Sequence, residues 1–139
     1  MYTYQYPRAA LTVDAIVYVT DSESIWVLLI KRGKDPFKDK WALPCGFIHM
    51  DETLEEACKR ELFEETGMKV EAMTQFKAFD TINRDPRHRT ISVVFTVQLN
   101  EKVHVEGRDD AALAGWFTIN QFPELAFDHQ QILEQFFNK

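Results

Sequence analysis

The sequence predicts a single domain, residues 1–139, of the α/β (α+β) class, with a mixed β-sheet between helices. Its length is that of one ordinary domain, and hydrophobic residues make up 45% of it, which is enough to build a core. Segments rich in β-branched residues are interleaved with two segments of helical periodicity, which favours a sheet covered by a helix on each face. We find no internal repeat, low-complexity tract or linker. Because periodicity does not fix strand order, a generic α+β domain is the alternative.

The chain before the first helix predicts mainly extended structure. Residues 10–20 are rich in β-branched side chains and predict a strand. After a polar turn at 21–24, residues 25–30 form a near-continuous apolar run, which is typical of a strand buried on both faces. A polar loop and then short extended structure follow, at residues 33–40 and 41–48 respectively.

Residues 53–66 predict the first helix. Asp51 or Thr53 is suited to cap its start, and Gly67 suits the left-handed conformation that follows a helix end. Apolar side chains recur at the spacing of one helix face, at Leu54, Ala57, Cys58 and Leu62. We expect this face to pack on the sheet.

The chain after this helix predicts further strands and a terminal helix. Residues 70–80 and 91–99 predict strands, and the polar stretch 84–89 lies in the link between them. Residues 116–118 predict a short strand after an acidic loop. Residues 125–137 have the apolar spacing of an amphipathic helix.

Three glutamates, Glu61, Glu64 and Glu65, crowd the end of the predicted helix. Residues three and four apart are neighbours on a helix, so these like charges repel one another, and they also lie at the negative end of the helix dipole. A sequence that breaks two local rules in one turn is expected to serve a site. A hard divalent cation with oxygen ligands, Mg²⁺ or Mn²⁺, removes both penalties.

The glutamates belong to a longer pattern that begins at Gly46 and ends at Met68, with Glu52, Arg60, Glu61, Leu62, Glu64, Glu65 and Gly67 between them. This spacing resembles the Nudix box, the signature of hydrolases that cleave nucleoside diphosphates linked to another group. The resemblance implies an α/β/α sandwich and a metal-dependent pyrophosphohydrolase.

The resemblance also implies a role for each residue of the box. Glu61, Glu64 and Glu65 match the metal ligands of the family's pattern, and Gly46 lets the loop backbone approach metal or phosphate. Arg60 is expected to pair with Glu52 and so pin the loop that precedes the helix. The predicted catalytic set is therefore Glu52, Arg60, Glu61, Glu64 and Glu65.

The general base stays open at this point. Glu61 is our first choice, and Glu106, Asp109 and Asp110 on the later acidic loop are the alternatives. Similar proteins usually carry a glutamate where this chain has Leu113, so that candidate is missing here.

Several stretches outside the box resemble one subgroup, the ADP-ribose pyrophosphatases. They are Leu11–Ala15, Leu29–Arg32, Trp41–Pro44, Arg84–Arg87, Asp109–Ala112 and Leu125–His129. Cys45 and His88 stand where that pattern usually has glycine. The resemblance implies hydrolysis of ADP-ribose to AMP and ribose 5-phosphate.

Substrate contacts are predicted from residue chemistry as well. Arg84, Arg87 and Arg89 concentrate positive charge on one link, Arg32 ends a predicted strand, and guanidinium groups suit bidentate phosphate contacts. An adenine ring needs an aromatic platform, for which Phe37 and Trp41 are candidates. The predicted substrate-binding residues are Arg32, Phe37, Trp41, Arg84, Arg87, Arg89, Asp109 and Asp110.

Histidine and cysteine chemistry is not expected. The four histidines show no metal-ligand spacing and are interpreted as structural or surface residues, at positions 49, 88, 104 and 129. No histidine stands at a spacing from Cys45 that suggests a Cys–His nucleophile.

Composition limits the partners and the compartment. The net charge of −6 argues against general attraction to nucleic acid or anionic membranes. Two cysteines, an N-terminus without a signal pattern and the lack of a long apolar run predict a cytoplasmic protein. A homodimer packed through Tyr2, Tyr4 and Tyr6 is a further possibility.

Two other functions compete with ADP-ribose hydrolysis. The box is shared by enzymes that act on (d)NTPs, dinucleoside polyphosphates or sugar nucleotides. The same stretches also resemble the Nudix-like sensor domain of transcriptional regulators of NAD metabolism, which continue into a winged-helix domain. Because the sequence stops at Lys139, directly after the predicted terminal helix, we expect the enzyme rather than a non-catalytic sensor.

Overall fold

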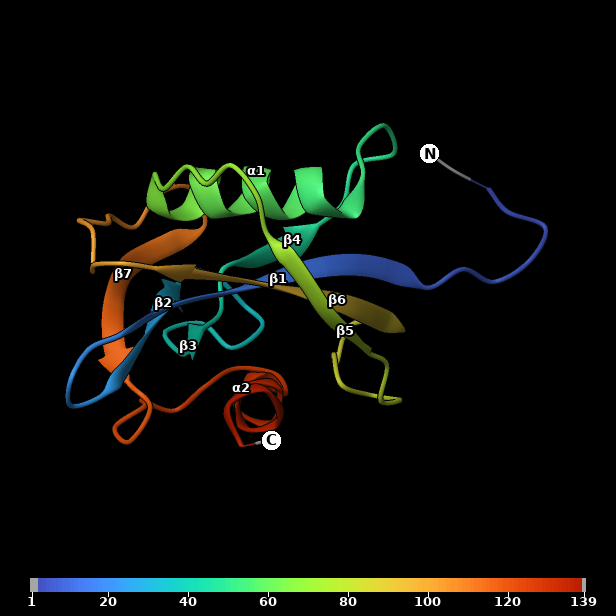
Figure 1. The fold of residues 1–139 in the computed structure, drawn as a ribbon. Helices are drawn as coiled ribbons and strands as arrows, with labels where there is room; N and C mark the ends of the chain where they lie inside the picture. Colours follow the sequence, from blue (N-terminus) through green and yellow to red (C-terminus); the bar gives the residue numbers. More distant parts are fainter. Residues whose placement is uncertain (1–2, 139) are drawn as a thin grey trace.

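A seven-stranded mixed sheet lies between two helices in the computed structural model, which describes residues 3–138 (Figure 1). Helix α1 (Leu54–Thr66) covers one face and α2 (His129–Phe137) covers the other, so the predicted α/β/α arrangement is confirmed. The strands are β1 (Ala10–Thr20), β2 (Ile25–Arg32), β3 (Trp41–Ala42), β4 (Cys45–Phe47), β5 (Thr74–Phe79), β6 (Thr90–Leu99) and β7 (Ala111–Thr118).

Strand β1 is the centre of the sheet. The order is β3-β2-β1-β6-β5, with β4 also paired to β1 and β7 paired to β2. Strands β1 and β6 are parallel along nearly their whole length, and the other pairs are antiparallel. Both faces of β1 are buried, which agrees with its near-continuous run of β-branched and apolar residues.

The two faces of the sheet carry separate hydrophobic clusters because strand side chains alternate between faces. On the α1 side, Val13 and Val17 of β1 pack with Ala57 and Leu62 of the helix. On the α2 side, Ile16 packs with residues that include Leu29, Val94, Ile132 and Leu133. The alternation also places Thr12 and Asp14, two polar side chains of β1, on the same side as α2.

Helix α1 has the two ends that the sequence predicts. Of the two N-cap candidates, Thr53 caps the helix: its hydroxyl accepts the Glu56 N–H, and the Glu56 carboxylate accepts the Thr53 N–H. Gly67 ends the helix with φ of 78°, and its N–H donates to the Phe63 carbonyl.

Three element boundaries differ from the prediction by four residues or more. Strand β7 begins at Ala111 and not at Trp116, because the small residues that precede Trp116 pair with β2 although their intrinsic strand preference is weak. Strand β5 begins at Thr74 rather than at residue 70. Helix α2 begins at His129, since Leu125 instead forms a bridge with Trp41.

Within residues 3–138, neither helix is long and apolar enough to cross a membrane.

Candidate active site

A cavity of about 290 Å³ opens between the end of α1 and the start of α2. Its walls come from β1, from the end of β2 and of β4 with the loops that follow them, and from α1. The link before β6 with the start of β6, the loop before β7, and the loop before α2 with the first residue of α2 complete them. These segments are far apart in the sequence. Glu61 and Glu65 of α1 face the cavity from one side, and Phe127 and His129 face it from the other.

The three box glutamates differ in their surroundings. Glu65 is buried, and its Oε1 accepts the Cys45 N–H at 2.8 Å, which ties α1 to β4. Burial raises the pKa of Glu65 well above its usual value; the Cys45 N–H lowers it in part, and neighbouring Glu61 raises it further. Glu64 is more open, with 41% of its side chain exposed.

Arg60 forms ion pairs with three glutamates of the box. Its Nη2 lies 2.6 Å from Glu52 Oε1, so the ion pair predicted from the box is present. Its Nη1 also contacts Glu61 at 2.7 Å and Glu64 at 3.1 Å. The hydrogen bonds from Arg60 lower the pKa of Glu52 to about 2. One guanidinium therefore faces three carboxylates, and net negative charge remains.

Gly46 leaves room for Glu61. A Cβ atom at Gly46 would lie 2.1 Å from Glu61 Cδ, so the Glu61 carboxylate would have to move. The need for glycine here thus comes from the packed carboxylate, in addition to any close approach of backbone to ligand.

The donor set next to Gly46 fits a hard divalent cation. A second hollow is lined by acidic residues alone, namely Glu61, Glu64, Glu65, Asp109 and Asp110. Hard cations such as Mg²⁺ and Mn²⁺ prefer oxygen ligands of this kind. The residues that would hold the cation are Glu61, Glu64 and Glu65, as the box predicts.

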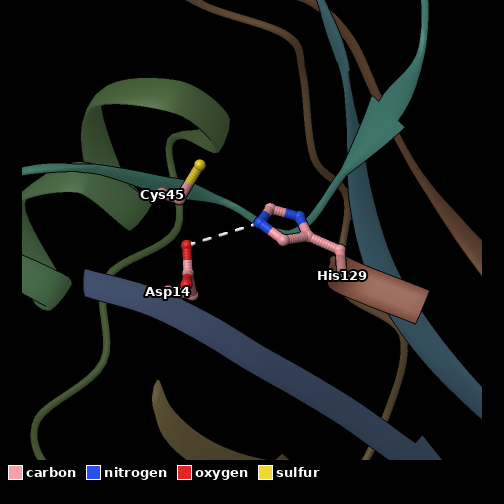
Figure 2. A group of neighbouring side chains, drawn as sticks. All are labelled: Asp14, Cys45 and His129. Atoms are coloured by element: carbon pink, nitrogen blue, oxygen red, sulfur yellow. Dashed lines mark ion pairs between the residues drawn. The ribbon is translucent and has the colours of Figure 1, made fainter. Parts of the chain in front are cut away.

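Asp14, Cys45 and His129 form a buried group at the floor of the cavity (Figure 2). They come from β1, β4 and the start of α2, and their side-chain donor atoms lie within 4.8 Å of one another. His129 Nε2 is 3.7 Å from Asp14 Oδ1, and Asp14 Oδ2 has no hydrogen-bond partner. Sequence spacing did not reveal this contact between a cysteine and a histidine.

Two members of this group, His129 and Cys45, are expected in their neutral forms. His129 Nδ1 accepts the Leu43 N–H at 3.0 Å, so in the neutral ring the proton is on Nε2, which then has no lone pair for a metal. Burial lowers the pKa of His129. Burial also raises the pKa of Cys45 well above its usual value, with Asp14 and Glu65 adding to the rise. A thiolate nucleophile at Cys45 is therefore not favoured, and the His129 ring, which also lines the cavity, is held by the Leu43 N–H.

The predicted arginines are distributed unevenly around the cavity. Arg32, Arg84 and Arg87 line it, whereas Arg89 does not and donates to the Asp80 carbonyl at 2.7 Å. Arg84 is almost fully buried, and both its Nε and Nη2 donate to the carboxylate of Asp128. Its positive charge is thus largely compensated.

Neither predicted aromatic platform lies in the cavity wall. Trp41 packs edge-on against Phe117 in the cluster beneath α2, with ring centres 4.7 Å apart. Phe37 contacts Phe127 from outside the cavity. The aromatic residues that do line it are Phe47 and Phe127, which the sequence analysis did not select. Phe47 directly follows Gly46 in the box, and this adjacency is the one signal that could have indicated it.

The acidic loop contributes two residues to the site. Asp109 lies in the carboxylate hollow, and Asp110 lies both there and in the main cavity, with Lys34 3.0 Å away. Glu106 instead contacts His104 on the surface and lines neither cavity. Among the loop candidates for the general base, geometry therefore favours Asp109 and Asp110.

Comparisons with known proteins agree with this architecture. A model of the NUDIX domain matches residues 9–136. The ADP-ribose pyrophosphatase of Methanocaldococcus jannaschii is 38% identical over 131 residues, which cover 94% of this chain and 75% of the relative. The ADPR responsive transcriptional repressor NtrR of Acinetobacter baylyi is 32% identical over 136 residues, which cover 95% of this chain and 54% of the repressor. The chain thus spans about half of that repressor.

Two solved structures carry informative ligands. The NUDIX domain of Shewanella oneidensis NrtR, complexed with ADP ribose, matches with a TM-score of 0.84 and 31% identity, covering 94% of this chain and 87% of that one. A bifunctional NMN adenylyltransferase/ADP ribose pyrophosphatase from Francisella tularensis, complexed with AMP and a Mn ion, matches with a TM-score of 0.86 and 33% identity. That match covers 97% of this chain and 43% of the other.

Proposed function

Because this chain belongs to the NUDIX family and is a pyrophosphohydrolase, we propose that its substrate is ADP-ribose, which it hydrolyses to AMP and ribose 5-phosphate with Mg²⁺ as cofactor. The observation that carries the proposal is one cavity that joins the box carboxylates to arginine and aromatic side chains. Such a cavity suits a ligand with a diphosphate in the middle and a base at one end. The 38% identity to an ADP-ribose pyrophosphatase supports the same choice.

The box residues have two kinds of role in this proposal, metal binding and positioning. Glu61, Glu64 and Glu65 would hold the cation, which when bound neutralises phosphate oxygens and favours ionisation of a water. Arg60 and Glu52 hold the loop and the helix end in place through their ion pair. The Cys45 N–H fixes the direction of the Glu65 carboxylate. These contacts preorganise the carboxylates before any ligand arrives.

Hydrolysis needs a base near the carboxylate hollow. Water adds to one phosphorus, the bridging P–O bond breaks, and the water's proton passes to a base. Glu61, Asp109 and Asp110 all line the hollow and are the candidates for that base. Glu61 remains our first choice.

A nucleotide panel tests the substrate. We expect Mg²⁺-dependent release of AMP and ribose 5-phosphate from ADP-ribose at a higher kcat/KM than any turnover of (d)NTPs, dinucleoside polyphosphates or sugar nucleotides. A strong preference for a dGTP analogue over ADP-ribose would overturn the choice of substrate. Repeating the panel with Mn²⁺ decides between the two cations.

The same panel addresses the sensor alternative, which the identity to an ADPR responsive repressor keeps open. A sensor would bind ADP-ribose in calorimetry and release no AMP. We favour the enzyme because every acidic position of the box is filled and because the carboxylates converge on one hollow. We also propose that neither nucleic acid nor membrane is a partner, given the net charge of −6.

The cytoplasmic location and the homodimer likewise remain proposals. Tyr4 and Tyr6 are exposed on the N-terminal segment, at 44% and 68%, and Tyr2 lies outside the described residues. A molecular mass measured by light scattering decides the oligomeric state.

A further inference from the structure

Three flat side chains from separate segments meet at the cavity wall. Phe47 ends β4, Arg87 lies in the link before β6, and Phe127 lies in the loop before α2. The Arg87 guanidinium carbon is 5.3 Å from the centre of the Phe47 ring and 5.7 Å from that of Phe127. All three line the same cavity as Glu61 and Glu65, two of the proposed metal ligands.

The Arg87 guanidinium is already paired with the carboxylate of Asp85 through its N–H groups. Its Nη2 lies 2.8 Å from Asp85 Oδ2 and its Nε lies 3.1 Å from Asp85 Oδ1, while the Arg87 backbone N–H donates to the same Oδ1. Asp85 is buried. This bidentate pair compensates the charge, and the guanidinium lies over the Phe47 and Phe127 rings. Arg87 is thus better suited to contact a ring than a phosphate.

Phe127 is held rigidly in its position. Its φ of 53° is in the left-handed region, which a bulky residue enters only when its surroundings require it. The ring packs against Phe37, with ring centres 4.8 Å apart, and Arg32 lies 5.0 Å from its centre. The ring is therefore in place before a ligand binds, which lowers the ordering cost of binding.

Phe47 is only partly covered, by Arg87 and by the His88 ring, whose centre lies 5.8 Å from that of Phe47. It is 40% exposed although it is a large apolar side chain beside a polar cavity. A planar aromatic ligand would cover this ring and gain stacking contacts with the guanidinium next to it.

We propose that Phe47, Arg87 and Phe127 form a stacking site for the nucleobase of the substrate. The inference rests on the proposed function, because it assumes a nucleotide whose diphosphate lies at Glu61, Glu64 and Glu65. It sets the orientation of that nucleotide, with the base at the stacking site and the hydrolysed bond at the carboxylates. Because every base has an aromatic face, the site contributes affinity more than discrimination between bases.

Calorimetry with the two products, AMP and ribose 5-phosphate, tests the stacking site. We expect Phe47→Ala to weaken AMP binding by roughly 5- to 150-fold, the range for loss of one base-stacking contact, and to leave ribose 5-phosphate binding unchanged. Phe47→Trp should restore AMP binding. The matched control is Phe63→Ala, a partly buried phenylalanine of α1 outside the cavity, which should change neither affinity.

Arg87 separates stacking from phosphate binding. Arg87→Lys keeps the charge and removes the plane, so we expect it to weaken AMP binding selectively. An equal loss for both products in Phe47→Ala or Arg87→Lys, or no loss of AMP binding in Phe47→Ala, would overturn the proposal.

The failure of the two proposals can be told apart. If the wild-type protein hydrolyses ADP-ribose while Phe47→Ala binds AMP normally, the stacking site is wrong and the function stands. If Phe47→Ala loses AMP binding selectively but the wild-type protein prefers another nucleotide, the substrate is wrong and the stacking site stands.

Discussion

Gly46 shows how a missing side chain determines where a neighbouring carboxylate lies. The place that a Cβ would take at residue 46 is occupied by the carboxylate of Glu61, whose position is also fixed by Arg60 at 2.7 Å. A methyl group there must displace the Glu61 carboxylate from its present position. The effect on catalysis is expected to exceed the effect on folding, since Glu61 borders open space into which it can move.

Gly46→Ala should therefore lower kcat/KM for the preferred substrate by about 100-fold or more, the cost of displacing a catalytic group by about an ångström. It should also weaken Mg²⁺ binding in calorimetry. Gly115→Ala is the control, because a Cβ at Gly115 meets only the Phe117 ring at an ordinary 3.6 Å. Wild-type activity in Gly46→Ala would show that Glu61 needs no fixed position.

The surroundings of His129 lead us to expect that the stability of the protein depends on pH. Burial lowers the pKa of His129, Asp14 and Asp128 oppose that shift, and Arg84 and Arg32 reinforce it. The unfolded chain therefore takes up a proton on this ring near pH 6.5, where the folded protein does not. Since the unfolded state then binds more protons, the stability contributed here is present above about pH 6.5 and is lost as the pH falls below it.

The prediction is that wild-type protein loses more stability than His129→Asn when the pH is lowered from about 7.5 to about 5.5. The free energy of unfolding from urea titrations at both values measures it. Other acidic groups titrate in both proteins, so the informative quantity is the difference between the two. Equal pH dependence in the two proteins would contradict a neutral His129 in the folded state.

Among the elements, helix α1 is the one that carries the carboxylates that we propose as metal ligands. Its start is fixed by the reciprocal hydrogen bonds of Thr53 and Glu56, and its end by the left-handed Gly67. Between these ends, one face packs on the sheet and the end of the helix presents Glu61, Glu64 and Glu65 to the hollow. The hydrogen-bonded N-terminal cap and the three carboxylates thus lie at opposite ends of the same helix.

Thr53→Ala should reduce the free energy of unfolding by about 1 kcal/mol, because the Glu56 N–H loses its side-chain acceptor. Urea unfolding measures the change, and Thr53→Ser, which keeps the hydroxyl, should stay near wild type. Turnover should be little affected, since the helix end that carries the carboxylates is unaltered. A loss of activity larger than the loss of folded protein would contradict this separation.

The elements also show what local sequence can predict. Helix α1 and the box were predictable because the cap, the apolar face and the glutamates lie within one short segment. The start of β7 was not, because four of the residues from Ala111 to Gly115 are alanine or glycine, and the segment becomes a strand only by pairing with β2. The proximity of Asp14, Cys45 and His129 could not be predicted for a similar reason, because the three residues belong to three different elements. Phe127 falls inside a helical pattern although it lies in the preceding loop.

At the scale of the whole molecule, the net charge of −6 is concentrated in part where a cation is expected. Glu65 is buried next to Glu61, and Arg60 compensates only part of the charge. Repulsion among these carboxylates opposes folding when no cation is bound. A ligand that binds only the folded state stabilises it by mass action, so the stability of the protein should depend on Mg²⁺.

Glu64→Gln or Glu65→Gln should lower turnover by orders of magnitude, raise the melting temperature in EDTA, and abolish the increase in melting temperature that Mg²⁺ causes in the wild type. The melting temperature in EDTA rises because one like charge is removed. Turnover and the response to Mg²⁺ are lost because the cation loses a ligand. Glu71→Gln, on the exposed chain after α1, is the control and should keep the Mg²⁺ response. Near-normal turnover in either box variant at saturating Mg²⁺ would refute the ligand assignment.

The walls of the cavity come from strands β1, β2, β4 and β6, from both helices and from adjoining loops, so they span the chain from Thr12 to His129. No contiguous fragment shorter than that span contains every wall. During refolding, enzymatic activity should therefore return in the last kinetic phase, after helix content has recovered. Cleavage by a protease between Phe79 and Thr90 would leave both pieces inactive unless they reassociate, which makes turnover a sensitive report of complete tertiary structure.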